Sequence, residues 1–404
     1  MAEAPQPSRG AFSFLMITLV LDSLTFGLTA PVLPTLLVEL EGGSIADTAG
    51  LLGLFGTAWA VMQFIASPIL GSLSDRYGRR PVLLISMAGL GLDYILMALA
   101  PSVIWLFVGR VLSGVTTAGY ATATAYVSDT TTGDARTKRF GLLGAAFGFG
   151  FIIGPAVGGF LAGFDVRAPF WCAAVLCLLN ATFGFFILQE SLPKERRSSF
   201  KWRNANFFGS WNLLRATPVL LTIGLTMFFV RLALDVNPAV IVIYTQTRYA
   251  WDAQDVGLML ATYGALSILV QALLIGPVLK YLGERAAMIF GLACGAIAFS
   301  FYASAPYGWV FLIGLPIGAL FTISNPAMQA IATRAVGDKN QGQLQGALAS
   351  LASIAAIIAP FMFTQAFTLG NAMTTIPGAI GMPYALSVGF FMIALLLTLR
   401  MPRT

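Results

Sequence analysis

Long apolar runs, separated by short polar segments, divide almost the whole of this chain. Each run is about as long as the ~20 residues that a helix needs to cross a bilayer. Only 10% of the residues are charged and 57% are hydrophobic, whereas a soluble domain carries about 25% charged residues. A transmembrane β-barrel would show short alternating segments instead. We therefore predict an all-α membrane protein with twelve transmembrane helices, over residues 11–38, 47–70, 81–100, 102–127, 137–163, 169–188, 217–243, 254–279, 285–304, 308–332, 342–368 and 378–399.

The lysines and arginines are distributed unevenly among the polar segments. Nineteen of the 23 fall on one side of the predicted membrane, only Arg167 and Arg248 fall on the other, and two lie inside spans. An excess of this kind marks the cytoplasmic side. We therefore expect a bacterial-type inner-membrane protein with both termini in the cytoplasm. The net charge of +6 is then a topology signal, and we expect no nucleic-acid partner.

The chain repeats itself at a nearly constant offset. Residues 276–285 match residues 71–80 in their glycine positions and final arginine, and the same offset of 205 takes Pro155 to Pro360. Parallel repeats of this kind place a substrate site near the midplane, between the halves. We predict two pseudo-symmetric six-helix bundles, residues 1–188 and 216–404, joined by a cytoplasmic linker, residues 189–215.

The first repeated segment is the most charged turn between two spans. Its glycines let the chain turn tightly, its arginines can anchor at lipid headgroups, and Asp75 suits a helix amino terminus or an arginine such as Arg139. We interpret the segment as a conformational latch: it would hold the cytoplasmic sides of the two halves together when the substrate cavity between them faces outward. The alternative is a purely topological anchor. The latch residues are Gly71, Asp75, Arg76, Gly78, Arg79 and Arg80.

A second motif lies inside the fifth predicted span. Glycines spaced by four remove the side chains from one helix face and let another helix pack closely, and a proline can bend the span. The motif residues are Gly150, Gly154, Pro155, Gly158 and Gly159.

Two of the ionisable side chains inside predicted spans are carboxylates near mid-depth, Asp22 and Asp93. Intramembrane ionisable residues are functional by default. Because burial disfavours the charged form of a carboxylate, each could hold a proton and, once ionised, attract a cationic substrate. This exchange is the minimum chemistry of antiport. The alternative is that an arginine neutralises the carboxylate permanently.

The other three charged groups away from the ends of the spans are Arg110, Arg231 and Asp235. Arg110 could help a neighbouring carboxylate release its proton, or it could be a structural partner, and the sequence does not choose between the two. Arg231 and Asp235 are four residues apart on one helix face, so they could pair. We favour a self-neutralised pair over a switchable one, and we expect Asn237 and Pro238 to break the helix beside it.

Polar side chains in other spans are weaker candidates for the substrate cavity, because they could simply bond to neighbouring helices. They are Gln63, Tyr94, Tyr126, Tyr263, Gln271, Asn325, Gln329, Gln345 and Gln365. The three cysteines, Cys172, Cys177 and Cys294, lie in spans and are interpreted as packing residues. The chain has no histidine, and it shows no nucleophile–base set and no phosphate-binding loop. We therefore expect no enzymatic activity, no cofactor and no resident metal.

Several of these motifs resemble those of the major facilitator superfamily. The pattern G-x-x-x-D-R-x-G-R-R at 71–80 resembles the loop between the second and third helices of that superfamily. The pattern G-x-x-x-G-P-x-x-G-G at 150–159 resembles a signature of its drug–proton antiporter branch, and R-x-x-x-G at 110–114 resembles an element of proton-coupled members. Within that branch the chain most resembles the tetracycline efflux proteins, for example in L-V-L-D at 19–22 and L-D-Y at 92–94.

This resemblance covers almost the whole chain and implies a function. It implies export of a tetracycline–divalent-cation complex against proton entry, with Asp22 and Asp93 carrying the charge exchange. The cation would enter only as part of the substrate, and the proton gradient would supply the energy. The carboxyl half departs from those exporters, which carry a histidine in the eighth span and an acidic residue in the ninth, so the substrate stays open.

We therefore expect a monomeric, proton-coupled antiporter in the lipid bilayer that exports a lipophilic, cationic or metal-chelated drug by alternating access. One alternative has the same fold and is a proton-coupled symporter of an organic anion, in which Arg231 or Arg110 binds a carboxylate. An alternative of another class is a membrane receptor or scaffold that transports nothing.

Overall fold

The computed structural model describes residues 9–116, 119–131, 133–193, 195, 197, 215, 217–336 and 341–401. Within these ranges the regular secondary structure is helical, and no strand occurs. Eleven of the described helical segments are long and apolar enough to cross a membrane, and a shorter apolar helix, Val103–Thr116, accompanies them. The prediction of an all-α, multi-pass membrane protein is confirmed.

The first half of the chain largely follows the predicted spans. Its helices are α1 (Arg9–Thr29), α2 (Leu33–Glu41), α3 (Ala49–Tyr77), α4 (Arg79–Ala98), α5 (Val103–Thr116), α6 (Gly119–Thr130), α7 (Gly133–Ala162) and α8 (Ala168–Ile187), with a 3-10 turn η1 (Ile45–Thr48) before α3. The predicted single span 11–38 is wrong, because the helix ends at Thr29 and restarts at Leu33. Pro31 has no amide N–H to donate, and Pro34 lies in the first turn of α2, so the two prolines end one helix and begin the next.

The second half contains two irregular points. Its helices are α10 (Pro218–Leu234), α11 (Val236–Tyr249), α12 (Ala253–Leu273), α13 (Ile275–Ser304), α14 (Gly308–Leu320), η4 (Phe321–Ile323), α15 (Ser324–Val336), α16 (Gln341–Ala372), η6 (Ala379–Gly381) and α17 (Met382–Arg400). The break expected at Asn237 and Pro238 occurs just before them, at Asp235. The ring of Pro238 would collide with the carbonyl four residues earlier, at Leu234, and this explains the position. The second irregularity is Gly283, a non-helical residue inside α13.

The described chain forms two compact units. The amino-terminal unit contains Met1–Gly43, Ala58–Ala205 and Asp252–Leu258, and the carboxyl-terminal unit contains Ser44–Thr57, Asn206–Trp251 and Met259–Thr404. Most of the predicted linker, residues 189–215, lies outside the described residues. The predicted domain boundaries therefore stay a prediction.

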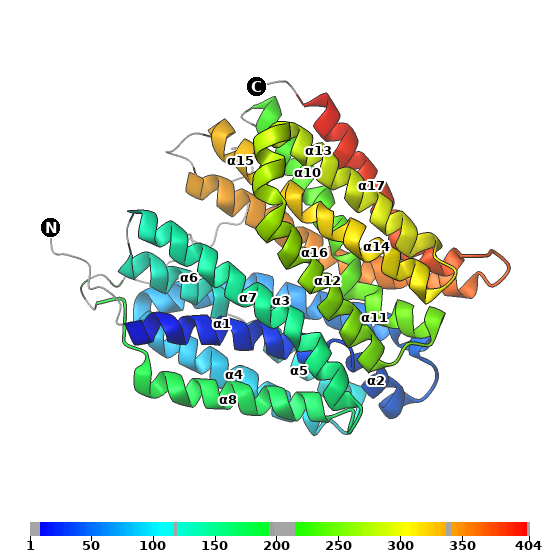
Figure 1. Ribbon diagram of the computed structural model, residues 1–404. Helices are drawn as coiled ribbons and strands as arrows, with labels where there is room; N and C mark the ends of the chain where they lie inside the picture. The colour runs from blue at the N-terminus through cyan, green and yellow to red at the C-terminus, as the bar shows by residue number, and fades with distance from the viewer. Residues whose placement is uncertain are drawn as a thin grey trace. The chain divides into compact units, whose positions relative to one another are not determined.

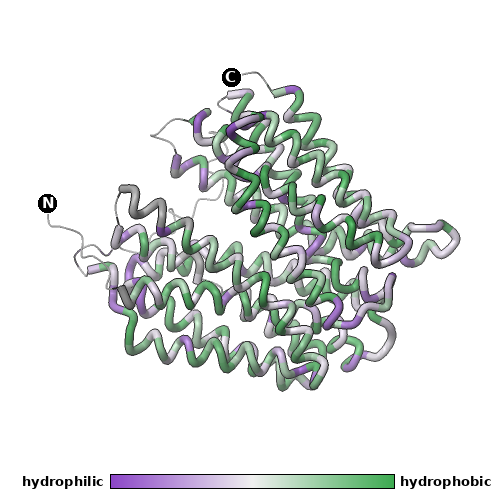
Figure 2. The backbone as a smooth tube through the Cα atoms, viewed as in Figure 1, coloured by the Kyte–Doolittle hydropathy of each residue, from purple (hydrophilic) through white to green (hydrophobic). Residues whose placement is uncertain are grey.

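Each unit consists of helices that pack along their lengths. In the amino-terminal unit α1 lies against α7 and α8, and α4 lies against α8 and α5 (Figure 1). In the carboxyl-terminal unit α13 lies against α14 and α17, and α10 lies against α17 and α16. Figure 2 shows hydrophobic residues along most of these helices and hydrophilic ones mainly toward their ends. Large apolar side chains such as Ile85, Ile104 and Phe186 are more than 70% exposed, as expected of helix faces that meet lipid.

Candidate functional site

Asp93 lies deep in the amino-terminal unit, on α4, and only 2% of the residue is exposed. The hydroxyl of Ser113 on α5 lies close to its carboxylate, but neither oxygen meets hydrogen-bond geometry with another described residue. Arg110 on α5 is close enough to attract it electrostatically, but no ion pair joins the two, and Nε of Arg110 is buried without a hydrogen-bond partner in the part of the chain that the structure describes. A Cβ at Gly109 would lie 3.0 Å from Oδ1 of Asp93, so this glycine lets the carboxylate approach α5. The carboxylate is thus buried beside a positive charge without forming an ion pair with it.

Asp22 on α1 belongs to the same cluster. It is half-buried, and a Cβ at Gly119, the first residue of α6, would collide with its Oδ2. Cys177 on α8 lies near both Asp22 and Asp93. Tyr94, 5% exposed, lies near Asp93 and Arg110 and completes the group. The predicted residues Asp22, Asp93, Arg110 and Tyr94 are therefore brought together.

The carboxyl-terminal unit holds a different arrangement. Nε of Arg231 lies 3.0 Å from Oδ1 of Asp235 and donates a hydrogen bond to its Oδ2 at 3.1 Å. The Asp235 side chain is 8% exposed and that of Arg231 is 51% exposed. Asp235 occupies the break between α10 and α11, so the pair lies where the helix is interrupted. The expected pairing of these two residues is confirmed.

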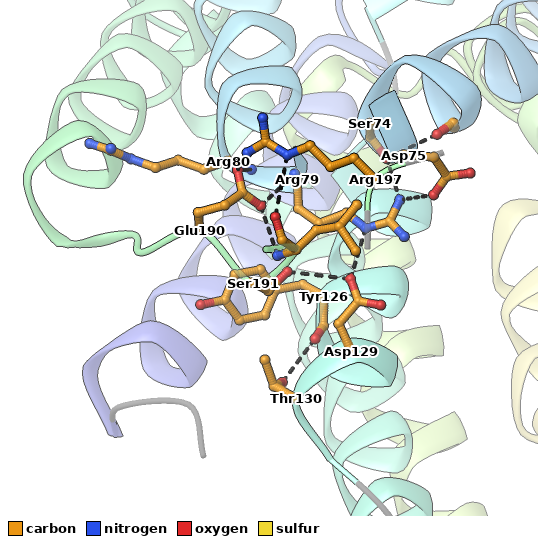
Figure 3. Close-up of polar contacts among 12 residues, drawn as sticks. Ser74, Asp75, Arg79, Arg80, Tyr126, Asp129, Thr130, Glu190, Ser191 and Arg197 are labelled. Carbon is orange, nitrogen blue, oxygen red and sulfur yellow. Dashed lines mark hydrogen bonds and ion pairs between the residues drawn. The ribbon is translucent and has the colours of Figure 1, made fainter. Parts of the chain in front are cut away.

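Arg79 is the centre of the predicted latch (Figure 3). Its guanidinium contacts Asp75 at 2.6 Å and Asp129 of α6 at 2.9 Å, and its Nη1 also donates to the hydroxyl of Ser74 at 2.6 Å. The residue is only 9% exposed. The expected headgroup-anchoring role is therefore wrong for Arg79, because packing against α6 removes it from the surface. The partner of Asp75 is Arg79, whereas Arg139, the arginine suggested for it, packs over the ring of Phe12.

The turn itself is shorter than expected. α3 continues to Tyr77 and α4 begins at Arg79, so Gly78 alone separates them. Gly78 has φ +107° and ψ 160°, a combination essentially restricted to glycine. Gly71 lies inside α3, and a Cβ there would meet no atom within 4 Å, so its expected turn-forming role is wrong. Arg80 donates to the carbonyl of Phe185 at 2.6 Å, and Arg76 is exposed beside the ring of Tyr77.

Two acidic residues of this site were not predicted. Asp129 binds Arg79, and Glu190, just after α8, binds the backbone at the start of α4 (Figure 3). The repeat contained a signal for the first: the offset of 205 relates Asp129 to Arg334 and Arg79 to Glu284, two pairs of opposite charges. Glu284 and Arg334 do form an ion pair in the carboxyl-terminal unit. Nothing comparable in the sequence indicated Glu190.

The glycine motif of α7 packs as predicted. A Cβ at Gly150, Gly154 or Gly158 would collide with the backbone of α1, at the carbonyls of residues 20, 24 and 28 respectively. These glycines therefore form one smooth face along which α1 and α7 approach closely. Pro155 contacts the neighbouring Gly27, and Gly159 faces the backbone at residues 253–254 of the same unit.

The weaker cavity candidates are scattered. Tyr126 packs in the apolar core of the amino-terminal unit with Phe14 and Leu143, so its burial is that of a packing residue. Gln345 donates to Gln329 at 3.3 Å, an interhelical bond of the kind considered as the alternative. The others lie on α3 (Gln63), α12 (Tyr263, Gln271), α15 (Asn325) and α16 (Gln365). Within the described ranges, no group of three His, Cys, Asp or Glu side chains could hold a metal ion.

Comparison with known proteins adds independent information. The sequence pattern of the Major Facilitator Superfamily matches residues 15–360 and 225–403. Tetracycline resistance protein, class C, of Escherichia coli is 40% identical over 379 residues, which cover 92% of this chain and 94% of that protein. Tetracycline resistance protein, class G, of Vibrio anguillarum is 39% identical over 364 residues, covering 89% and 91%. The crystal structure of the human organic anion transporter MFSD10 (TETRAN) superimposes with a TM-score of 0.71 at 23% identity, covering 97% of this chain and 100% of that one.

Proposed function

Because this chain belongs to the major facilitator superfamily, we propose that it is a proton-coupled antiporter that exports a lipophilic, cationic or metal-chelated drug such as tetracycline. The similarity to tetracycline resistance proteins along nearly the whole chain supports a drug exporter. The observation that carries the proton-coupled mechanism is Asp93, a carboxylate that is 2% exposed and forms no ion pair with another described residue.

The chemistry of Asp93 explains why transport would be an exchange. A charged carboxylate out of water is costly unless a positive charge accompanies it. Asp93 can therefore take up a proton or hold the positive charge of a substrate, and it cannot do both at once. Substrate entering from the cytoplasm would displace the proton, and a proton entering from outside would displace the substrate. Arg110, close by without forming an ion pair, would favour loss of the proton, and Asp22 would offer a second site of the same kind.

The Arg231–Asp235 pair has a subordinate role in this proposal. Its charges already balance each other, so it needs neither a proton nor a substrate to be stable in the membrane. Protonation of Asp235 would free Arg231, whose side chain is half-exposed, and this makes the pair a second titrating element. In the alternative mechanism, symport of an organic anion, Arg231 would bind the substrate carboxylate.

The remaining parts of the proposal concern the setting. The excess of Lys and Arg in alternate segments supports an inner-membrane protein with both termini in the cytoplasm. The partners would be protons, one small-molecule substrate and the lipid bilayer, for a monomeric transporter without nucleic acid. A divalent cation would enter only within the substrate complex, and the proton gradient would be the only energy source.

The test is transport by purified protein in vesicles with an imposed pH gradient and Mg²⁺–tetracycline as the substrate. Wild-type protein should move the drug opposite to the proton flux, and Asp93→Asn and Asp22→Asn should each abolish gradient-driven transport. Glu41→Gln, which changes an exposed acid at the end of α2, is the control and should transport normally. Full transport by both aspartate variants would contradict the mechanism, and movement of substrate in the same direction as protons would favour the symporter.

A further inference from the structure

Helix α4 begins without a capping side chain of its own. Its N-cap is Gly78, so the first amide groups of the helix need an acceptor from elsewhere. Both oxygens of Glu190 provide it: Oε1 accepts from the amide of Arg79 at 2.8 Å and Oε2 from that of Arg80 at 3.3 Å (Figure 3). A carboxylate at this position also suits the positive end of the helix dipole. Glu190 therefore caps α4 from a distance of more than 100 residues along the chain.

The same carboxylate organises the start of the predicted linker. Oε1 accepts a hydrogen bond from the amide of Leu192 at 3.0 Å, and Oε2 lies 3.8 Å from Arg197. The adjacent Ser191 donates to Asp129 at 3.4 Å, the carboxylate that also binds Arg79. Two consecutive linker residues thus contact the latch, one through the backbone of α4 and one through the acidic partner of Arg79.

Gly78 is shaped to this contact as well as to the turn. A Cβ at Gly78 would collide with Oε2 of Glu190 and lie 2.6 Å from its Cδ. Only a residue without a side chain leaves room for the carboxylate to reach the amides of Arg79 and Arg80. The contact between Glu190 and the start of α4 therefore requires a glycine at position 78.

We propose that Glu190 is a positioning residue of the transport cycle, which joins the linker to the latch and to the helix that carries Asp93. Asp93 lies on the same unbroken helix, 14 residues after Arg79, or about 21 Å along its axis. A helix transmits a displacement of its first turn along its length, so the linker would hold Arg79 against Asp129 and also set the position of Asp93. This inference rests on the proposed efflux function.

The test combines a structural readout with transport, using the full-length protein in lipid nanodiscs and vesicles. Glu190→Ala removes the cap, Glu190→Gln keeps one oxygen acceptor, and Glu195→Ala removes an exposed acid from the same segment as the matched control. Hydrogen–deuterium exchange of residues 79–83 should rise about tenfold in Glu190→Ala, because two amides lose a charged acceptor. It should rise less in Glu190→Gln and stay at the wild-type rate in Glu195→Ala.

Transport of Mg²⁺–tetracycline should show the functional part. We expect Glu190→Ala to lower the maximal rate severalfold with little change in KM, because the residue does not touch substrate, and Glu190→Gln to recover part of the rate. Unchanged exchange in Glu190→Ala would overturn the capping role. Raised exchange with a wild-type rate of transport would overturn the positioning role and leave the efflux function intact. Absence of proton-driven efflux in the wild type would contradict the proposed function and, with it, the transport role of Glu190. The hydrogen–deuterium exchange rates would still show whether Glu190 caps α4.

Discussion

The turns at Gly78 and Gly283 have similar structures at equivalent positions of the two repeats. The two glycines are 205 residues apart, and their backbone angles are similar, with φ +107° and ψ 160° in one and φ +75° and ψ 167° in the other. In each turn the second residue after the glycine is an arginine that donates to carbonyls at the end of another helix. Arg80 reaches Phe185 at 2.6 Å, and Arg285 reaches Leu399 at 2.9 Å.

The ion pair beside each turn is present in both units but with opposite polarity. Arg79 pairs with Asp129 in the amino-terminal unit, and Glu284 pairs with Arg334 at the equivalent positions of the carboxyl-terminal unit. The repeat therefore retains the attraction between two helices and not the sign of either charge. What this contact requires is complementarity.

The two turns differ in how deeply their charges are buried. In the first, the Arg79 side chain is 11% exposed and has Asp75 as a second partner; in the second, Lys280 takes the place of Asp75, and the Arg334 side chain is 69% exposed. Removing one member of a buried pair costs about 3–5 kcal/mol, whereas an exposed pair is worth about 1 kcal/mol or less. Within the membrane the pairing is reversed: among the described residues Asp93 of the amino-terminal unit forms no ion pair, whereas Asp235 of the carboxyl-terminal unit pairs with Arg231.

The largest expected difference concerns these intramembrane acids. Asp93→Asn should abolish proton-driven drug transport, because it removes the buried carboxylate on which the proposed exchange of proton and substrate depends. Asp235→Asn separates a pair whose arginine is half-exposed to begin with, so transport should fall by less than about fivefold. Initial rates of drug uptake in vesicles with a pH gradient measure both. Equal losses in the two variants would break the contrast between the units.

The second difference concerns the latch arginine. Arg79→Ala leaves Asp129, whose side chain is 21% exposed, without its partner, and it should lower the free energy of unfolding by about 3 kcal/mol. Lys280→Ala, at an exposed position of the other turn, is the matched control and should change it by no more than about 0.5 kcal/mol. Denaturant titration of the purified protein in detergent gives both values. A loss below 1 kcal/mol in Arg79→Ala would mean that the network is not buried in solution.

The two glycines separate backbone strain from crowding. A Cβ at Gly283 would meet no atom within 4 Å, so Gly283→Ala introduces backbone strain without a collision. It should therefore lower the free energy of unfolding by about 1–3 kcal/mol. Gly78→Ala carries the same strain and also displaces Glu190, so it should be the more destabilising of the two. Both are measured by the denaturant titration used for Arg79.

A double substitution decides whether this extra cost comes from the contact with Glu190. In a Glu190→Ala background the collision is gone, and Gly78→Ala should then cost no more than Gly283→Ala. Additive effects of Gly78→Ala and Glu190→Ala would show that the two residues do not interact.

The membrane fold, the glycine motif of α7 and the contacts of the latch differ in how far the amino-acid sequence predicts them. The apolar runs and the unequal placement of Lys and Arg predicted the membrane fold, because the bilayer constrains length and polarity locally. The glycines of α7 could be predicted to face a helix, since their spacing defines a helix face. The partner of Arg79 left no local pattern, because Asp129 is 50 residues away and their approach depends on how α4 and α6 pack, so only the opposite charges of the repeat indicated it. Glu190 was hidden for the same reason, since a cap supplied from another segment leaves no local pattern.

The smallest expected effect is the most direct test of complementarity. Glu284→Arg and Arg334→Glu each place like charges side by side, and each should lower the free energy of unfolding by up to about 1 kcal/mol, since the pair is exposed. The double variant gives the carboxyl-terminal turn the polarity of Arg79 and Asp129, and it should return to within about 0.5 kcal/mol of the wild type. Denaturant titrations at low and high salt measure the four proteins, and salt should reduce the single-variant losses. A double variant as unstable as the sum of its parts would mean that polarity at this turn does matter, because the helix ends around it would then favour one sign at each position.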